Sequence, residues 1–256
     1  MSKSIRFSEI DAWRGYALFA MAIYHFFYFL HYGNIINIPY GSQTLPVITL
    51  EAIGSFARNS FVFLVGISAA LSYIKRSVIL KHPFNKIYLH FLKRGILVIL
   101  SASLISIGSY IFASDKFIYF GILHFIGLSI IFIPFFLYNK SIATGGLIIS
   151  ILVAFLVPTI NLNPNYLTLI LGLTTPYATI DYFPFLHWFP LIIFGGLVGL
   201  HLYTNYKSHP ILLRTSAYVP KPKWLIYIGN HTFSIYFIHI TLLLILTGIL
   251  QIIFIN

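Results

Sequence analysis

Seven apolar stretches, separated by short loops that hold most of the basic residues, constrain the fold more than any other feature of this sequence. A helix needs about 20 apolar residues to cross the hydrocarbon core of a bilayer. We therefore predict an all-α polytopic protein of the cell membrane, with about seven transmembrane helices in a single domain over residues 1–256. The predicted spans are Gly15–Tyr32, Phe56–Ile74, Gly95–Phe112, Phe117–Tyr138, Ser141–Val157, Phe185–Tyr203 and Thr232–Ile253.

The composition excludes a soluble domain. Charged residues make up 8% of the chain, against about 25% in soluble domains, and the mean hydropathy is +0.89. The net charge of +11 does not indicate nucleic acid, because the basic residues lie in the loops between apolar spans. The chain has no cysteine, which excludes thiol nucleophiles and cysteine-bound metals.

The distribution of basic residues predicts that the N-terminus is cytoplasmic. Cytoplasmic loops of membrane proteins carry an excess of Lys and Arg. With the N-terminus inside, only Lys116 falls in an outer loop and only Arg58 inside a span, so that 14 of the 16 basic residues are cytoplasmic. These are Lys3, Arg6, Arg14, Lys75, Arg76, Lys81, Lys86, Lys93, Arg94, Lys140, Lys207, Arg214, Lys221 and Lys223.

The segment Pro158–Pro184 does not fit the pattern of a span. Its apolar core, Tyr166–Leu173, is too short to cross a bilayer and is flanked by Pro and Asn. An eighth span there would also place the basic loop Thr204–Lys223 outside. We predict a re-entrant or surface segment, which is tolerated at depth only where protein buries its backbone.

Ionisable residues in the first span form a stripe along one helix face. Arg14 and His25 are eleven residues apart, which is about three turns, and Asp11 lies one turn before Arg14. Ionisable groups inside a membrane are costly and therefore mark functional candidates. In the simpler interpretation, Arg14 reaches the lipid phosphates and His25 hydrogen-bonds a neighbouring helix.

Further polar residues gather in the outer half of the predicted bundle. Arg58 lies near the outer end of the second span, His124 about two turns below the outer end of the fourth, and Asp181 and His187 bracket the start of the sixth. His239 lies near the middle of the last span. Each alone is more often a hydrogen-bonded bundle residue than a catalyst, so their common depth is the signal.

Several site classes are absent from the sequence. There is no H-E-x-x-H motif and no pair of histidines at positions i and i+4 in one span, so we predict no metal. A serine triad has no G-x-S-x-G motif, and no lysine lies in a span for a retinal-type receptor. The basic loop Lys75–Arg94 is suited to an anionic ligand or to lipid headgroups.

Motifs in five predicted spans resemble one known family. They are D-A-W-R-G-Y-A-L-F-A-M-A-I-Y-H, F-V-F-L-V-G-I-S-A-A-L-S, F-G-I-L-H-F-I-G-L-S, D-Y-F-P-F-L-H-W-F-P and I-G-N-H-T-F-S-I-Y-F-I-H, in chain order. In this order they resemble the catalytic domain of heparan-α-glucosaminide N-acetyltransferase and its small prokaryotic relatives, within the transmembrane acyltransferase superfamily. The lysosomal enzyme is considerably longer, and its active histidine follows the first helix at a greater distance, so His25 and His31 compete for that role.

The resemblance implies an enzyme that takes acetyl-CoA from the cytoplasm and acetylates a carbohydrate on the far side. The catalytic candidates are then His25, His31, Arg58, His124 and Asp181. Candidates for holding the donor are Asp11, Arg14, Lys75, Arg76, Lys93, Arg94 and His239. Direct transfer and an acetyl-histidine intermediate both stay open.

Two other function classes compete with the acyltransferase. A transporter or proton-conducting channel would use the histidines as a relay, and a b-type haem protein would need two histidines facing each other at one depth. The expected partners of the acyltransferase are acetyl-CoA, a carbohydrate acceptor and membrane lipids. A homo-oligomer is left open.

Overall fold

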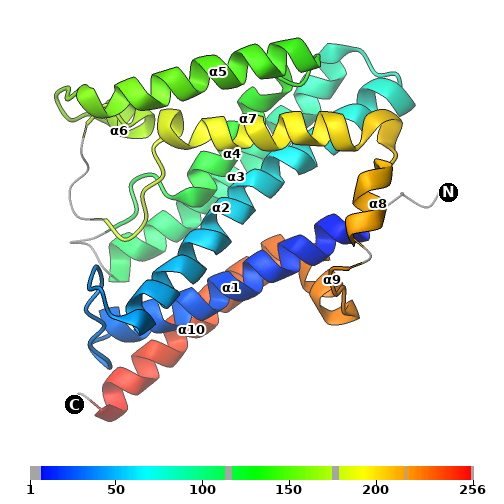
Figure 1. Cartoon of the computed structure of the whole chain (residues 1–256). Helices are drawn as coiled ribbons and strands as arrows, with labels where there is room; N and C mark the ends of the chain where they lie inside the picture. The colour runs from blue at the N-terminus through cyan, green and yellow to red at the C-terminus, as the bar shows by residue number, and fades with distance from the viewer. Residues whose placement is uncertain (1–6, 113–116, 175–178, 217, 255–256) are drawn as a thin grey trace. The chain divides into compact units, whose positions relative to one another are not determined.

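The computed structural model describes residues 7–112, 117–174, 179–216 and 218–254, whose regular structure is helical (Figure 1). Lys3, Arg6 and Lys116 of the predicted charge pattern lie outside these residues. Within them there is no sheet, and one isolated parallel bridge joins Phe120 and Tyr182. The helices are α1 Ser8–Tyr32, α2 Leu45–Ile74, α3 Phe84–Phe112, α4 Ile122–Phe132, α5 Lys140–Leu156, α6 Tyr166–Leu171, α7 Phe185–Leu202, α8 Pro210–Ser216, α9 Lys223–Asn230 and α10 Thr232–Phe254.

Five of the described helices are long and apolar enough to cross a bilayer, which agrees with an integral membrane protein. They are α2, α3, α5, α7 and α10, and they correspond to five of the seven predicted spans. Helix α1, with 25 residues, has the length but is not one of these five. Helix α4, with 11 residues, is shorter than the predicted span Phe117–Tyr138. A helix of this length rises only about 16 Å, which is too short to cross a bilayer. The count of seven stays a prediction.

Many of the exposed side chains on the long helices are large and apolar. Leu100 and Leu104 on α3 are 63% and 68% exposed, and Phe155 on α5 is 76% exposed. Continuous apolar surface of this kind marks contact with a membrane or a partner. On helices long enough to span a bilayer, lipid is the solvent that suits it.

The chain divides into two compact units, which are described separately. The terminal unit comprises Met1–Phe61 and Leu213–Asn256, and the central unit comprises Val62–Leu212, so the division falls within α2. The prediction of a single domain over residues 1–256 stays a prediction.

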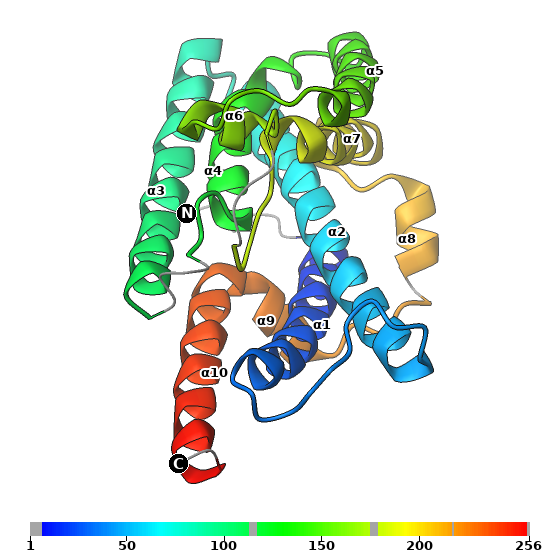
Figure 2. The ribbon, with the colours of Figure 1, turned by 90° about the vertical axis from the view of Figure 1, so that its left-hand side faces the viewer.

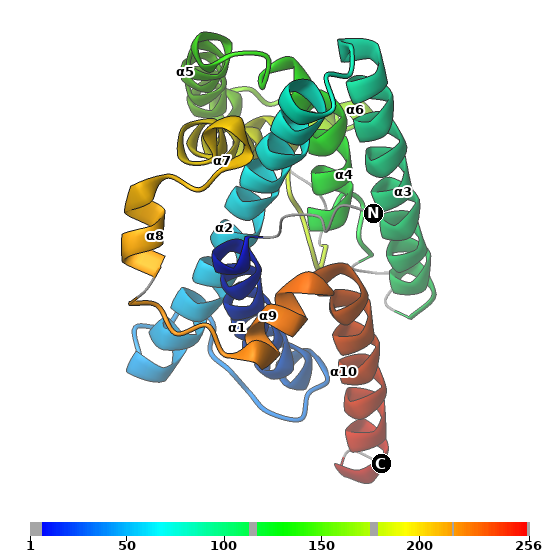
Figure 3. The same cartoon turned by 90° about the vertical axis from the view of Figure 1, so that its right-hand side faces the viewer.

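In the terminal unit, α1 packs against both α9 and α10 (Figure 3). Two glycines allow the backbones of α1 and α9 to touch. A side chain at Gly15 would meet the backbone carbonyl of Leu225, and one at Gly229 would meet the carbonyl of Asp11. Trp224 of α9 also places its ring edge-on to Phe19 of α1, with centroids 5.8 Å apart.

In the central unit, α3 packs along α4 and α5 packs along α7 (Figure 2). Small residues mediate the α3–α4 contact. A β-carbon at Gly95 would lie 2.6 Å from the carbonyl oxygen of Gly127, and one at Gly127 would lie 2.9 Å from that of Gly95. Interfaces between membrane helices are rich in small residues for this reason.

Among its described residues, the segment Pro158–Pro184 contains one α-helix, the short α6. Asn165 and Thr168 form a capping box at its start, and Gly172 ends it with φ of +85°, a conformation that favours glycine. A helix of six residues rises only about 9 Å, too little to cross a bilayer. The re-entrant placement stays a prediction.

Candidate functional site

The first candidate cluster is a histidine pair in the terminal unit, in which His25 of α1 contacts His239 of α10. Nδ1 of His25 lies 3.1 Å from Nε2 of His239, and the two ring planes are inclined by only 10°. Nδ1 of His239 lies 3.2 Å from the backbone oxygen of Ile235, one turn earlier on α10. The sequence predicts His239 among the donor-binding residues, whereas the structure brings it against the predicted catalytic base.

His31, the rival of His25, holds a turn. Its Nδ1 accepts a hydrogen bond of 3.1 Å from the backbone N–H of Ile38, and its ring lies edge-on to Tyr40 at 5.1 Å between centroids. Burial, reinforced by the neighbouring Tyr24, raises the pKa of Tyr40 to about 12. These contacts fold the connection after α1 back on its last turn, so His31 has a structural function in this unit.

Arg58 of α2 lies beside the histidine-bearing part of α1. Gly54, one turn before Arg58, packs so closely on Tyr24 that a β-carbon would lie 2.5 Å from the ring. The charge of Arg58 acts on the phenol of Tyr24, the residue before His25. The terminal unit thus brings a cation near the segment that carries His25.

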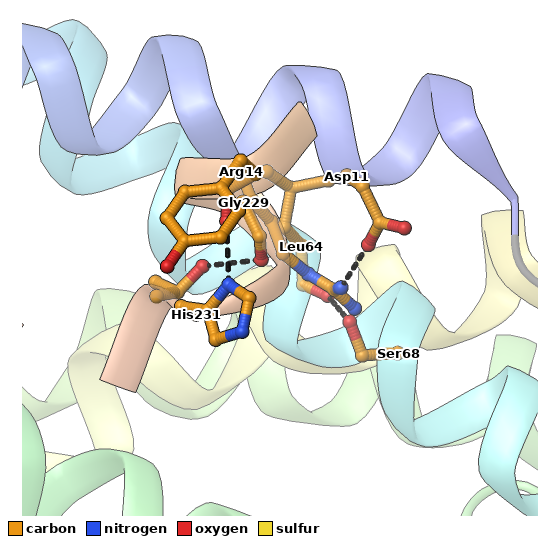
Figure 4. A network of polar contacts seen from close by, with 8 residues as sticks. Asp11, Arg14, Leu64, Ser68, Gly229 and His231 are labelled. Carbon is orange, nitrogen blue, oxygen red and sulfur yellow. Dashed lines mark hydrogen bonds and ion pairs between the residues drawn. The ribbon is translucent and has the colours of Figure 1, made fainter. Parts of the chain in front are cut away.

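Asp11 and Arg14 form an ion pair at the start of α1, as Figure 4 shows. Nη1 of Arg14 donates to Oδ1 of Asp11 at 2.7 Å, and the side chains are 26% and 9% exposed. Asp11 therefore neutralises part of the charge with which Arg14 is expected to meet the donor. The pair is consistent with the predicted one-turn spacing on α1.

Asp181 of the central unit caps helix α4. Its Oδ2 accepts a hydrogen bond of 2.8 Å from the backbone N–H of Ile122, the first residue of that helix. The loop around Asp181 is joined to the strand-like segment before α4, because Phe183 donates its N–H to the Phe120 oxygen at 3.0 Å. The hydrogen bond gives Asp181 a structural partner, in addition to its predicted catalytic function.

His124 lies on the first turn of α4 and is 7% exposed. Its ring packs beside Phe120 at 5.8 Å between centroids, and it makes no hydrogen bond within the described part of the chain. His187, at the start of α7, is exposed and lies against Trp188. The residues predicted to share one depth belong to different units. The terminal unit holds His25, His31 and Arg58, and the central unit holds His124 and Asp181. Their common depth therefore stays a prediction.

The second candidate cluster, called the basic cluster, comprises Lys75, Arg76, His90 and Arg94 of the central unit. Nη1 of Arg76 donates to the Ser72 carbonyl and hydroxyl oxygens at 3.2 and 2.9 Å, and Nη2 lies 3.1 Å from Nδ1 of His90. The like charges of Arg76 and Arg94 act on each other. Asp181, which binds α4, is the only acidic residue in the described part of this unit.

His90 presents an unused donor to this cluster. A guanidinium only donates, so Nδ1 of His90 accepts and the ring hydrogen of the neutral form lies on Nε2. Nε2 is buried and has no hydrogen-bond partner among the described residues. A buried N–H among uncompensated cations is suited to an anion.

The cluster is built on irregular backbone. Helix α2 continues into a π-helical turn, Lys75–Ile79, and such turns are frequent at functional sites. The ammonium of Lys75 lies 6.0 Å from the ring centroid of Tyr206, whose φ of +59° is rare for a bulky residue. Burial raises the pKa of Tyr206, and the positive charge of Arg76 lowers it to a smaller extent.

His90 and Tyr206 were not among the predicted site residues. His90 has a sequence signal, since it lies one helical turn before Arg94 and therefore on the same face of α3. Tyr206 has none, because its contact with Lys75 depends on tertiary packing. Lys93, the residue before Arg94 of the basic cluster, is exposed on α3. Among the described residues, no group of three His, Asp or Glu side chains could hold a metal ion.

A known protein family matches most of the chain. The sequence model described as "Heparan-alpha-glucosaminide N-acetyltransferase, catalytic" matches residues 6–241. This range includes the histidine pair and the basic cluster. No curated protein and no solved structure gives a significant match.

Proposed function

The chain belongs to the heparan-alpha-glucosaminide N-acetyltransferase catalytic family, and on that premise we propose that it is a membrane-embedded acyltransferase. Its donor is acetyl-CoA from the cytoplasm, and its acceptor is a sugar or glycan hydroxyl or amine at the outer face. The observation that carries the proposal is the family match over residues 6–241, in a chain whose long helices are apolar.

We assign the basic cluster to the phosphates of the donor. Phosphate oxygens suit the guanidinium groups of Arg76 and Arg94 and the N–H of His90, because charge-assisted hydrogen bonds are the strong ones. Lys75, Lys93 and Arg14 add positive charge that attracts the polyanion. Supporting this assignment are the hydrogen bond from Arg76 to His90 and the buried, unused Nε2 of His90.

We assign the chemistry to His25. The acceptor oxygen or nitrogen attacks the thioester carbonyl carbon while His25 removes its proton. The carbon–sulfur bond then breaks, and the proton passes from the imidazolium to the departing CoA sulfur. Arg58 and His124 are the candidates for stabilising the oxyanion in a water-poor site, and an acetyl-histidine intermediate would use the same His25 nitrogen as nucleophile.

The test uses the purified full chain in liposomes, with acetyl-labelled acetyl-CoA and glucosamine as the acceptor probe. We expect calorimetric binding of acetyl-CoA, release of CoA thiol and formation of labelled acetylglucosamine. We expect His25→Ala to bind acetyl-CoA and to release thiol about 10²–10⁴-fold more slowly than the wild type. Failure of the wild-type protein to bind acetyl-CoA would contradict the proposal. Uptake of solute without thiol release would indicate a transporter instead.

A further inference from the structure

The histidine pair contains a hydrogen-bond chain whose direction is fixed at one end. The chain runs from the Ile235 carbonyl through both rings of the pair, with separations of 3.2 Å at Ile235 and 3.1 Å between the rings. A carbonyl oxygen can only accept, so Nδ1 of His239 is the donor to Ile235. The backbone of α10 therefore sets the protonation pattern of its own histidine.

The direction at Ile235 determines the tautomer of the next ring. A neutral imidazole has one donor and one acceptor nitrogen. With its hydrogen on Nδ1, His239 accepts through Nε2, and Nδ1 of His25 must then be the donor. The lone pair of His25 is left on Nε2, which makes no hydrogen bond to the described residues. The tautomer of a histidine is commonly set in this way by the bond its other nitrogen makes.

We propose that His239 is a positioning residue, which holds His25 in the Nδ1–H tautomer and so leaves Nε2 as the atom that takes the acceptor proton. This inference rests on the proposed function for its kinetic part, whereas the tautomer itself is a property of the resting protein. The acid of a serine-protease triad does the same for its histidine, fixing its tautomer and orientation and stabilising the imidazolium. Here a second, neutral histidine takes the place of the acid.

The histidine pair can take the proton of the acceptor and pass it on during acetyl transfer. When Nε2 of His25 takes the acceptor proton, both of its nitrogens carry hydrogen, and Nδ1–H still donates to the lone pair of His239. The positive charge is then stabilised by a hydrogen bond that already exists, without any rearrangement of the rings. Delivery of the Nε2 proton to the CoA sulfur restores the starting tautomer, so the pair neither gains nor loses protons in a cycle.

The tautomer can be measured directly by nitrogen NMR on protein with 15N-labelled imidazoles, because protonated and unprotonated ring nitrogens differ widely in chemical shift. The signals lost in His25→Phe identify His25 among the ten histidines. We expect an unprotonated Nε2 on His25 in the wild-type protein and a mixture of tautomers in His239→Phe. A wild-type His25 with hydrogen on Nε2 would overturn the inference, whatever the enzyme does.

Kinetics separates positioning from structural support. We expect His239→Phe to lower kcat by about 10–100-fold, the range seen when a metal-bound histidine loses the partner that orients it, with the KM for acetyl-CoA unchanged. His239→Gln should restore most of kcat, because its amide oxygen can accept from Nδ1–H of His25. The matched control is His201→Phe on α7. Like His239, His201 bonds the backbone oxygen one turn earlier, here that of Leu197 at 2.9 Å, but its ring is exposed.

The possible outcomes separate the two proposals. Unchanged kcat in His239→Phe, with His25→Ala inactive, would overturn the function of His239 and keep His25 as base. Full activity in His25→Ala would refute the assigned base, while the NMR result would still decide the tautomer. Equal losses in the Phe and Gln variants, with unaltered His25 tautomer signals, would also count against positioning.

Discussion

The carboxylate of Asp181 accepts a hydrogen bond of 2.8 Å from the backbone N–H of Ile122, and the two residues lie 59 positions apart. The N-cap residue of α4 is Gly121, which has no side chain to cap the helix. Asp181 supplies the missing acceptor, and its negative charge also suits the positive end of the helix dipole. This relation explains the one acidic residue in the described part of the central unit without invoking chemistry.

We expect Asp181→Ala to destabilise the protein by about 1–2 kcal/mol, as loss of an N-cap acceptor does. Asp181→Asn keeps a side-chain oxygen and should stay close to the wild type in both stability and acetyl transfer. Thermal unfolding in detergent and the transfer assay measure the two effects. A folded Asn variant that binds acetyl-CoA and does not transfer acetyl would instead support the catalytic function predicted from sequence.

The hydropathy of the sequence predicts the apolar parts of α2 and α3 correctly, but it does not predict the residues at which these helices begin. The sequence predicts a span from Phe56, yet α2 starts at Leu45, and it predicts a span from Gly95, yet α3 starts at Phe84. Both early turns carry polar residues, such as Glu51 and Lys86, which a hydropathy window assigns to loops. A helix can extend beyond the hydrocarbon core, so apolarity alone does not mark its ends.

The sequence predicts which candidate residues share one helix, such as Asp11 and Arg14, and does not predict the contacts between helices. The spacing of Arg14 and His25 placed both on one face of α1, because that follows from helix geometry alone. The partner of His25 lies 214 positions away on α10, and the packing of α1 against α10 follows from neither composition nor periodicity. For the same reason the contact of His31 with Ile38, which gives this histidine a structural function, was not foreseen.

We expect the alanine variants of His25 and His31 to behave differently. His25→Ala should lose about 10²–10⁴-fold in transfer rate, as expected for a general base, with acetyl-CoA affinity unchanged. His31→Ala should retain transfer and lose about 1 kcal/mol of stability, since the Ile38 N–H loses its acceptor. His31→Asn, which restores an acceptor oxygen, is the control. Loss of transfer in His31→Asn, with an active His25→Ala, would move the base to His31.

We expect Arg94→Gln to weaken CoA binding by about 10–100-fold, the range for one hydrogen bond to a charged group. The matched control is Lys86→Gln on the same helix, which removes the same charge from an exposed position outside the basic cluster. Calorimetry at two salt concentrations should show the smaller effect of Lys86 shrinking at high salt, because exposed charges are screened. Equal affinities for the two variants would mean that the basic cluster binds lipid and not the donor.

We expect cysteines introduced at Lys81 and Asn163 to react with a membrane-impermeant maleimide from opposite faces of the membrane. The natural chain has no cysteine, so each variant carries one reactive site, and both positions are exposed. The orientation follows from the excess of basic residues in the loops assigned to the cytoplasm. Reaction of both cysteines from one face would refute the seven-span topology.

We expect Gly229→Ala to destabilise the terminal unit. The added methyl group would overlap the carbonyl of Asp11, a backbone atom that can move only if α1 and α9 separate. Overpacking of this kind commonly costs about 1–3 kcal/mol. The matched control is Gly248→Ala in α10, where no atom of another part of the described chain lies within 4 Å of the new β-carbon and where Ala should stabilise the helix by about 0.5–1 kcal/mol. Thermal unfolding of both variants in detergent measures the difference. Equal unfolding temperatures would show that α1 and α9 are not in backbone contact. A lower temperature for Gly229→Ala alone would support that contact, because both variants add the same methyl group to a helix.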